Sequence, residues 1–246
     1  MARDAGALIL RHVPQNVATQ NKPDGSPMTD ADRQANDYIV GRLRQLTPLI
    51  PVVAEESRNE QHGTKGRFWL VDPLDGTESY KRGEPEFTVN IALIEDAAPV
   101  LGVIYDPSHD VLYWAARGQG AWRQSGGDTQ QIRVRTTPED GLRIIKSRRK
   151  PSSTFLEKLG NMTYSEMHLV GSSIKFCRVA EGRADLYPRF GDTMEWDTAA
   201  GHAILNEAGG RVVVAGTNQE LTYGKPGYKN PHFIAAAEKP APSMQR

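Results

Sequence analysis

The chain has 246 residues, enough to bury a sizeable core in one large domain or two closely packed ones. Its 30 acidic and 30 basic residues balance, which excludes a global basic surface for a nucleic-acid polymer. The single cysteine, Cys177, excludes an internal disulfide and a cysteine-based zinc site, and within an apolar helix it is expected to be a core residue. No apolar run approaches the roughly 18 residues of a membrane-spanning helix. We therefore expect a cytoplasmic protein, and peripheral attachment to the inner membrane face stays open.

The first part of the chain combines two helices with a series of strands. Helical spacing predicts a short helix ending near Leu10 and a longer one from Thr29 or Asp30 to about Leu46. The polar, glycine-rich stretch 124–130 is expected to be the tip of a hairpin. The expected strands are Pro51–Val53, Phe68–Asp72, Phe87–Glu95, Val100–Tyr105, Val111–Ala115, Ile132–Val134 and Leu142–Lys146.

The pattern changes after Lys150, where helices and short strands alternate. We place a soft boundary there, between an N-terminal α+β half (1–150) and a C-terminal α/β half (151–246) that completes one compact unit. The pair Gly209-Gly210 is a typical helix C-terminus. The expected helices are Thr154–Leu159, Ile174–Glu181 with Ser172 as its cap, and Thr198–Ala208, and the expected strands are Asp185–Tyr187, Arg211–Ala215 and Phe233–Ala237.

The stretch V-D-P-L-D-G-T places two acids, Asp72 and Asp75, three residues apart at a predicted strand end. Pro73 favours extended geometry at the residue before it, and Gly76 permits a backbone shape closed to other residues. Both carboxylates and the Leu74 carbonyl would then point to one place, and oxygen ligands of this kind suit a magnesium ion. A β-turn with two solvated acids explains the same seven residues, and both interpretations stay open.

Other acids stand at similar positions, and each also has an ordinary explanation. Glu55 and Glu56 follow a short apolar strand, where adjacent glutamates are usually solvated. Asp197 begins a predicted helix, where an acid is commonly an N-cap. Asp32 lies in the first turn of the long helix, where the dipole favours a negative charge. Spacing alone does not show that these acids meet.

Three motifs occur in a fixed order, E-E-S at 55–57, D-P-L-D-G-T at 72–77 and W-D-T-A-A-G-H-A at 196–203. Together they resemble the inositol monophosphatase-like family of magnesium-dependent, lithium-sensitive phosphatases, over nearly the whole chain. Within this family, the chain is most similar to bacterial 3′(2′),5′-bisphosphate nucleotidases. That finer match rests on F-T-V-N-I-A-L-I at 87–94, G-S-S-I-K-F-C-R-V-A-E-G at 171–182 and A-D-L-Y-P-R-F-G at 184–191.

The resemblance implies an α/β fold, the layered α/β/α/β/α sandwich of the sugar phosphatases, and a site for two or three Mg²⁺ ions. Asp32 and Thr77 would align and deprotonate the attacking water with help from Glu56 or a neighbouring metal-bound site, and the backbone at Gly76-Thr77 would hold phosphate. The implied metal ligands are Glu55, Asp72, the Leu74 carbonyl, Asp75 and Asp197. Several carboxylates would repel one another unless cations lay between them, and helix starts near Thr77, Ser172 and Thr198 would add phosphate donors.

The expected substrate is a phosphorylated small molecule, adenosine 3′,5′-bisphosphate, hydrolysed to AMP and phosphate. By resemblance this clears a nucleotide by-product of sulfate assimilation. Lys175 and Arg189 are candidates for the second phosphate, although Lys175 could be a surface residue and Arg189 could pair with an acid. The basic run Lys146–Lys150 is a further candidate. Relatives carry S-R-S-H where this chain has S-R-R-K at 147–150, which leaves base or ribose recognition open, although Ser147-Arg148 remains.

Two rival functions stay open, an inositol or sugar-alcohol monophosphatase and a non-catalytic nucleotide sensor. The sequence does not separate a monomer from a homodimer. His202 lies inside a predicted helix, and because imidazole is an unusual ligand for hard cations, we expect it to support the site by packing rather than to bind metal.

Overall fold

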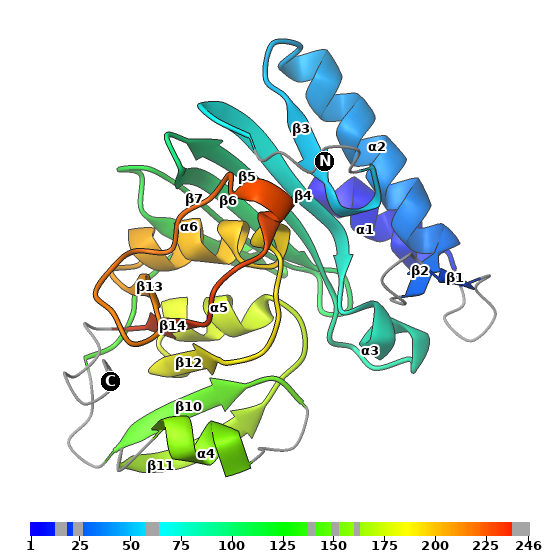
Figure 1. Cartoon of the computed structure of the whole chain (residues 1–246). Helices are drawn as coiled ribbons and strands as arrows, with labels where there is room; N and C mark the ends of the chain where they lie inside the picture. The colour runs from blue at the N-terminus through cyan, green and yellow to red at the C-terminus, as the bar shows by residue number, and fades with distance from the viewer. Residues whose placement is uncertain are drawn as a thin grey trace.

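The computed structural model has layers in the order helix, sheet, helix, sheet, helix (Figure 1). This is the α/β/α/β/α sandwich that the resemblance implies, so the predicted fold class is confirmed. No helix among the described residues is long and apolar enough to cross a membrane. The structure describes residues 1–12, 19–21, 27–57, 64–136, 141–148, 153–159 and 163–237.

The larger sheet has seven strands, in the spatial order β3-β4-β5-β6-β7-β8-β9. These strands are β3 (Val52–Ala54), β4 (Arg67–Asp75), β5 (Thr88–Glu95), β6 (Ala98–Asp106), β7 (Val111–Ala116), β8 (Ala121–Ser125) and β9 (Asp128–Ile132). The β3–β4 pair is parallel and the other pairs are antiparallel. In β5, Val89 and Ile91 face one core while Ala92 and Ile94 face another. Successive side chains of a strand point to opposite faces of the sheet, so β5 contributes to both cores.

The smaller sheet has five strands, in the order β11-β10-β12-β14-β13. These are β10 (Leu142–Lys146), β11 (Tyr164–Leu169), β12 (Leu186–Arg189), β13 (Arg211–Val214) and β14 (Phe233–Ala236). In β14, Phe233 faces the core between the sheets and Ile234 faces the outer core. Since β10 belongs to this sheet, the change of sheet falls between β9 and β10. The division into halves at residue 150 stays an interpretation of the sequence.

Helices fill the space between and outside the sheets. They are α1 (Ala2–Leu10), α2 (Asp30–Leu46), α3 (Thr77–Lys81), α4 (Ser153–Leu159), α5 (Ile174–Ala180) and α6 (Ala199–Glu207), with short 3₁₀ turns η2 (Glu55–Ser57), η3 (Glu195–Asp197) and η4 (Pro226–Tyr228), and the small hairpin β1 (Thr19–Asn21) and β2 (Pro27–Thr29). Helices α1 and α2 cover the outer face of the larger sheet, α5 and α6 lie between the sheets, and α4 covers the smaller sheet (Figure 1).

Helix α6 lies close to β6, which matters because Asp197 lies two residues before the first residue of α6, Ala199. A Cβ added to Gly102 of β6 would lie 2.3 Å from the Ala200 carbonyl oxygen. Only glycine at this position allows the helix to approach the strand so closely. The close packing places the start of α6 directly over the larger sheet.

Most predicted elements are confirmed, and the differences are in polar segments. The stretch 124–130 is a hairpin, but β8 and β9 extend into it and leave only Gly126-Gly127 at the tip. Of the predicted strand 132–134, only Ile132 is in a strand, and β11 was not predicted. Both β9 and β11 are mainly exposed, so they lack the apolar alternation that marks a strand. The N-cap position of α5 is Ser173, whereas the hydroxyl of the predicted cap, Ser172, accepts a hydrogen bond from the backbone N–H of Ile174 at 3.5 Å.

Candidate active site

Three of the predicted ligands meet at one place. Asp72 and Asp75 lie on β4, and Asp197 is the last residue of η3. One carboxylate oxygen from each lies within 4.8 Å of the others. Asp72 is buried, whereas the other two are partly buried. Packing of α6 on the larger sheet therefore brings together acids that are far apart in the sequence.

This acidic group is electrostatically costly without a cation. Burial raises the pKa of Asp75, and Glu55 raises it further, while Lys175 lowers it. Burial also raises the pKa of Asp197, with further contributions from the charges of Asp75 and Glu55. A cation among them would relieve the repulsion, and oxygen donors are the ligands that Mg²⁺ prefers. The residues present therefore fit a divalent cation.

The turn after Asp72 departs from regular strand geometry. The backbone N–H of Leu74 donates to Asp72 Oδ1 at 3.1 Å. The register of β4 against β5 shifts between Asp72 and Asp75, which frees this part of the strand from the ladder. Gly76 follows with φ of 93°, and a Cβ there would lie 2.7 Å from the Glu86 carbonyl oxygen. Positive φ and close contact together explain why glycine is required.

Asp32 and Thr77 are in direct contact, although they are far apart in sequence. Thr77 Oγ1 lies 3.1 Å from Asp32 Oδ1 and 3.1 Å from the Leu74 carbonyl oxygen, either of which can accept a hydrogen bond from the hydroxyl. Asp32 Oδ2 accepts a hydrogen bond from the backbone N–H of Thr29 at 2.7 Å and another from its hydroxyl. The capping box of α2 thus holds the carboxylate that faces Thr77.

Glu55 and Glu56 lie in η2, directly after β3, and both are partly buried. Since β3 pairs in parallel with β4, the two strands end at the same edge of the sheet. The charge of Glu55 acts on both Asp75 and Asp197, so it lies near the acidic group. The ligand role of Glu55 and the role of Glu56 beside it stay predictions.

The predicted phosphate-binding cations lie next to this group. Lys175 is 4% exposed, so the alternative of a surface lysine is wrong. Its Nζ donates to the Ser172 carbonyl and lies 5.1 Å from the centroid of the Tyr187 ring. Burial lowers the pKa of Lys175 to about 8. Arg189 donates to Ser147 Oγ, which brings two predicted substrate residues together.

Glu86 is a site residue that sequence reasoning missed. Its carboxylate accepts hydrogen bonds from Arg148, with Nε at 2.6 Å, and from the backbone N–H of Gly171. It therefore joins the turn at Gly76, the loop before α5 and the basic stretch around Arg148. No local pattern signals this role. The capping role of Thr29 for Asp32, in contrast, was readable from the motif T-x-x-D.

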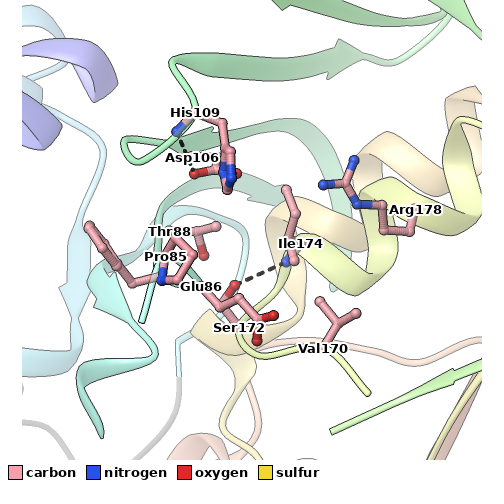
Figure 2. A pocket seen from close by; sticks show the side chains of 10 residues that line it. Pro85, Glu86, Thr88, Asp106, His109, Val170, Ser172, Ile174 and Arg178 are labelled. Atoms are coloured by element: carbon pink, nitrogen blue, oxygen red, sulfur yellow. Dashed lines mark hydrogen bonds and ion pairs between the residues drawn. The ribbon is translucent and has the colours of Figure 1, made fainter. Parts of the chain in front are cut away.

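A pocket of about 250 Å³ opens at the edge of the site. In Figure 2, Ser172 and Glu86 lie on one side of it, opposite Asp106 and His109. His109 Nδ1 lies 2.8 Å from Asp106 Oδ2, so this wall is a polar pair. Ser172 thus belongs both to the predicted phosphate site and to the lining of this pocket.

The sandwich and its acidic group together define a class of metal-dependent phosphatases. The chain belongs to the inositol monophosphatase family, because the family's profile matches residues 1–243.

Relatives within this family narrow the similarity further. The 3′(2′),5′-bisphosphate nucleotidase CysQ of Salmonella typhimurium is 47% identical over 221 residues, covering 86% of this chain and 87% of that protein. The crystal structure of CysQ from Bacteroides thetaiotaomicron has a TM-score of 0.80 and 37% identity, covering 100% of this chain and 94% of the other. The IMPase of Thermotoga maritima has a TM-score of 0.77 and 26% identity, covering 96% and 89%.

Proposed function

We propose that this chain is a magnesium-dependent 3′(2′),5′-bisphosphate nucleotidase that hydrolyses the 3′-phosphate of adenosine 3′,5′-bisphosphate to AMP and phosphate. The observation that carries the proposal is the convergence of Asp72, Asp75 and Asp197. It occurs in a chain that is 47% identical to a CysQ nucleotidase over 86% of its length. A hard-cation site in a phosphatase fold favours phosphoester hydrolysis.

Two or three Mg²⁺ ions are inferred at the acidic group. When bound, they would neutralise charge on the phosphoryl group and lower the pKa of the attacking water. Carboxylate and carbonyl oxygens are the donor set that supports this choice of cation. The proposed ligands are Glu55, Asp72, the Leu74 carbonyl, Asp75 and Asp197.

Asp32 and Thr77 would orient the attacking water and accept its proton. While the Thr77 hydroxyl donates to Asp32 Oδ1, its lone pairs can accept a hydrogen bond from water. A proton can then pass from the water to Thr77 Oγ1 as the hydroxyl proton moves to Asp32 Oδ1. Thr29 holds the other carboxylate oxygen, which keeps Asp32 directed at Thr77. Glu56 would assist in the same step.

The second phosphate of the substrate would be held by Lys175 and Arg189. With a pKa of about 8, Lys175 is mainly protonated at neutral pH and can pair with an anion. Ser147 holds the guanidinium of Arg189 and would add a hydroxyl donor. The backbone at Gly76 and the hydroxyls of Thr77 and Ser172 would contact the phosphate that is transferred.

A substrate panel with and without Mg²⁺ tests this function. We expect phosphate release from adenosine 3′,5′-bisphosphate with a higher kcat/KM than from inositol phosphate, and inhibition by lithium. Asp75→Asn should abolish turnover. Asp185→Asn is the matched control, because Asp185 is a buried aspartate outside the acidic group that pairs with Arg135, and it should retain activity. Near-wild-type turnover by Asp75→Asn would refute the metal site.

The similarity to the Thermotoga maritima IMPase keeps a monophosphatase as the second candidate. A higher kcat/KM on inositol phosphate in the same panel would favour it. Tight nucleotide binding without turnover at saturating Mg²⁺ would instead indicate a sensor.

A further inference from the structure

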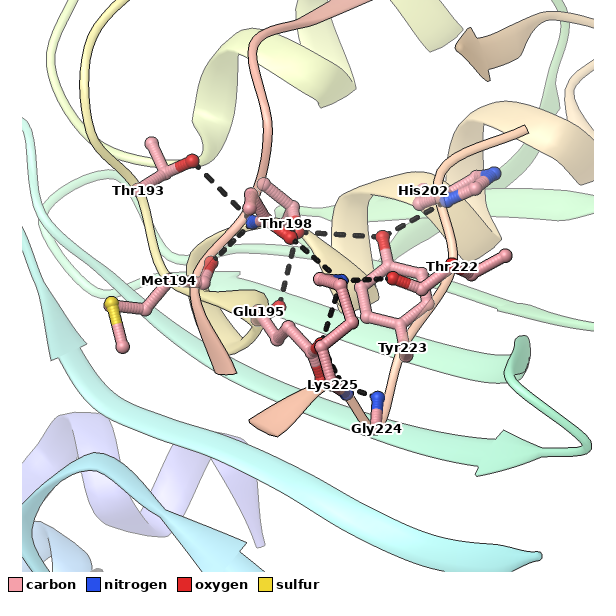
Figure 3. Close-up of polar contacts among 10 residues, drawn as sticks. Thr193, Met194, Glu195, Thr198, His202, Thr222, Tyr223, Gly224 and Lys225 are labelled. Atoms are coloured by element: carbon pink, nitrogen blue, oxygen red, sulfur yellow. Dashed lines mark hydrogen bonds and ion pairs between the residues drawn. The ribbon is translucent and has the colours of Figure 1, made fainter. Parts of the chain in front are cut away.

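We propose that the segment 222–230 positions Asp197 for metal binding through the buried carboxylate of Glu195. Glu195 is then a positioning residue that acts through the turn it shares with Asp197, and it is not itself a ligand. The inference rests on the proposed metal site and extends it to residues outside the acidic group. Figure 3 shows the contacts of Glu195 with Gly224 and Lys225.

Glu195 is 0% exposed, and both of its carboxylate oxygens have hydrogen-bond partners. It accepts hydrogen bonds from the backbone N–H groups of Gly224 at 2.7 Å and Lys225 at 3.0 Å. The Nζ of Lys225 adds an ion pair at 2.7 Å. A buried carboxylate is tolerated only when it is paired in this way. The pairing therefore ties η3 to the segment 222–230.

The segment 222–230 also contacts Met194, the residue that precedes η3. Asn230 Nδ2 donates to the Met194 carbonyl at 2.7 Å. The backbone N–H of Met194 in turn donates to Asp197 Oδ2 at 2.8 Å. One segment thus contacts the turn at both Glu195 and Met194, and Met194 reaches the carboxylate of Asp197 directly.

Asp197 depends on such contacts more than the other acids do. Asp72 lies within β4, where it pairs with Asn90 of β5, and the residue before it, Val71, pairs with both β3 and β5. Asp197 ends a 3₁₀ turn of only three residues, which has little stability of its own. The Thr198 hydroxyl donates to the Glu195 carbonyl at 3.1 Å, so a displaced Glu195 also disturbs the residue after Asp197. Loss of the Glu195 contacts should therefore move one ligand and leave the others in place.

Mn²⁺ binding to the full chain without substrate tests the inference, followed by the electron paramagnetic resonance signal of free Mn²⁺. Glu195→Gln and Lys225→Met should each weaken Mn²⁺ binding about 10-fold, the lower end of the range for residues that support metal ligands. Lys225→Arg keeps the charge and should restore most of the affinity. At saturating metal, the KM for the nucleotide should change little.

Asp185→Asn is the matched control for a purely structural loss. Asp185 is 2% exposed and accepts hydrogen bonds from Arg135, at 2.6 Å and 2.8 Å, and from the backbone N–H of Arg143 at 2.7 Å. This variant should lower the melting temperature in chelator yet keep the wild-type Mn²⁺ affinity. It should also keep the rise in melting temperature on adding Mn²⁺, which Glu195→Gln should reduce.

The outcomes separate the two proposals. Wild-type Mn²⁺ affinity in Glu195→Gln and Lys225→Met would overturn this inference and leave the nucleotidase function intact. Wild-type chain that binds no Mn²⁺ would overturn both. If Glu195→Gln does not fold, the comparison of Lys225→Met with Lys225→Arg decides, and equal affinity in these two would also overturn the positioning role.

Discussion

Replacing Gly76 by alanine is a sharp test of the turn that links the ligands to the phosphate site. The left-handed backbone at φ of 93° costs about 1–2 kcal/mol for a residue with a Cβ. The new Cβ would also lie 2.7 Å from the Glu86 carbonyl oxygen and 3.3 Å from the Phe87 Cα. Both neighbours are backbone atoms that cannot rotate away, so about 1–3 kcal/mol of overpacking is added.

Gly66→Ala is the matched control, since Gly66 also has positive φ, at 72°, but an added Cβ would meet nothing within 4 Å. It should lower the free energy of unfolding by about 1–2 kcal/mol, and Gly76→Ala should lower it by about 1–3 kcal/mol more. Urea denaturation in chelator measures both values without a contribution from bound metal.

Activity separates the two variants further. Gly76 stands between Asp75 and Thr77, so a shift of about 1 Å there should lower kcat about 100-fold. Gly66→Ala should retain kcat. Equal losses of stability in the two variants, with normal kcat in Gly76→Ala, would refute the reasoning.

Two further predictions concern single side chains. Thr77→Ala should lower kcat about 100-fold at saturating Mg²⁺ because water loses its acceptor, whereas Thr77→Ser should retain most of it, and steady-state kinetics that do not distinguish them would exclude the relay. Burial lowers the pKa of His202, although Glu220 partly opposes this shift. At pH values between the lowered pKa and the ordinary value near 6.5, the unfolded chain therefore binds more protons than the folded chain. The free energy of unfolding should therefore fall as pH drops below about 6.5, and His202→Gln should flatten this dependence in urea titrations at several pH values. An unchanged slope in the variant would assign the pH dependence to other groups.

Local sequence patterns predicted the helices and strands that are specified by residues close to one another in the sequence. Helix α2 combines apolar spacing with a capping Thr29, and β5 is rich in apolar residues that pack into the cores on its two faces. Strand β11 lies at the edge of the smaller sheet, beside β10, and is mainly exposed. Because most of its side chains contact solvent rather than a core, its sequence lacks the apolar alternation by which a strand is predicted.

The candidate site divides in the same way. Asp72 to Thr77 form one continuous turn, whose Pro73 and Gly76 are visible in the sequence. The meeting of Asp197 with that turn depends on the approach of α6 to β6 at Gly102, which no spacing rule predicts. The family resemblance predicted that Asp197 and this turn would meet, whereas the roles of Glu86 and Glu195 arise only from tertiary contacts.

The position of Asp197 has a consequence for how the chain acquires its activity. Asp72 and Asp75 belong to the larger sheet, while Asp197 reaches them only after the helices of the central layer have docked. Contacts between such distant residues form slowly, because a long loop must close first. We therefore expect full cation affinity only once α6 has packed on the larger sheet, since a chain without that packing lacks the third carboxylate.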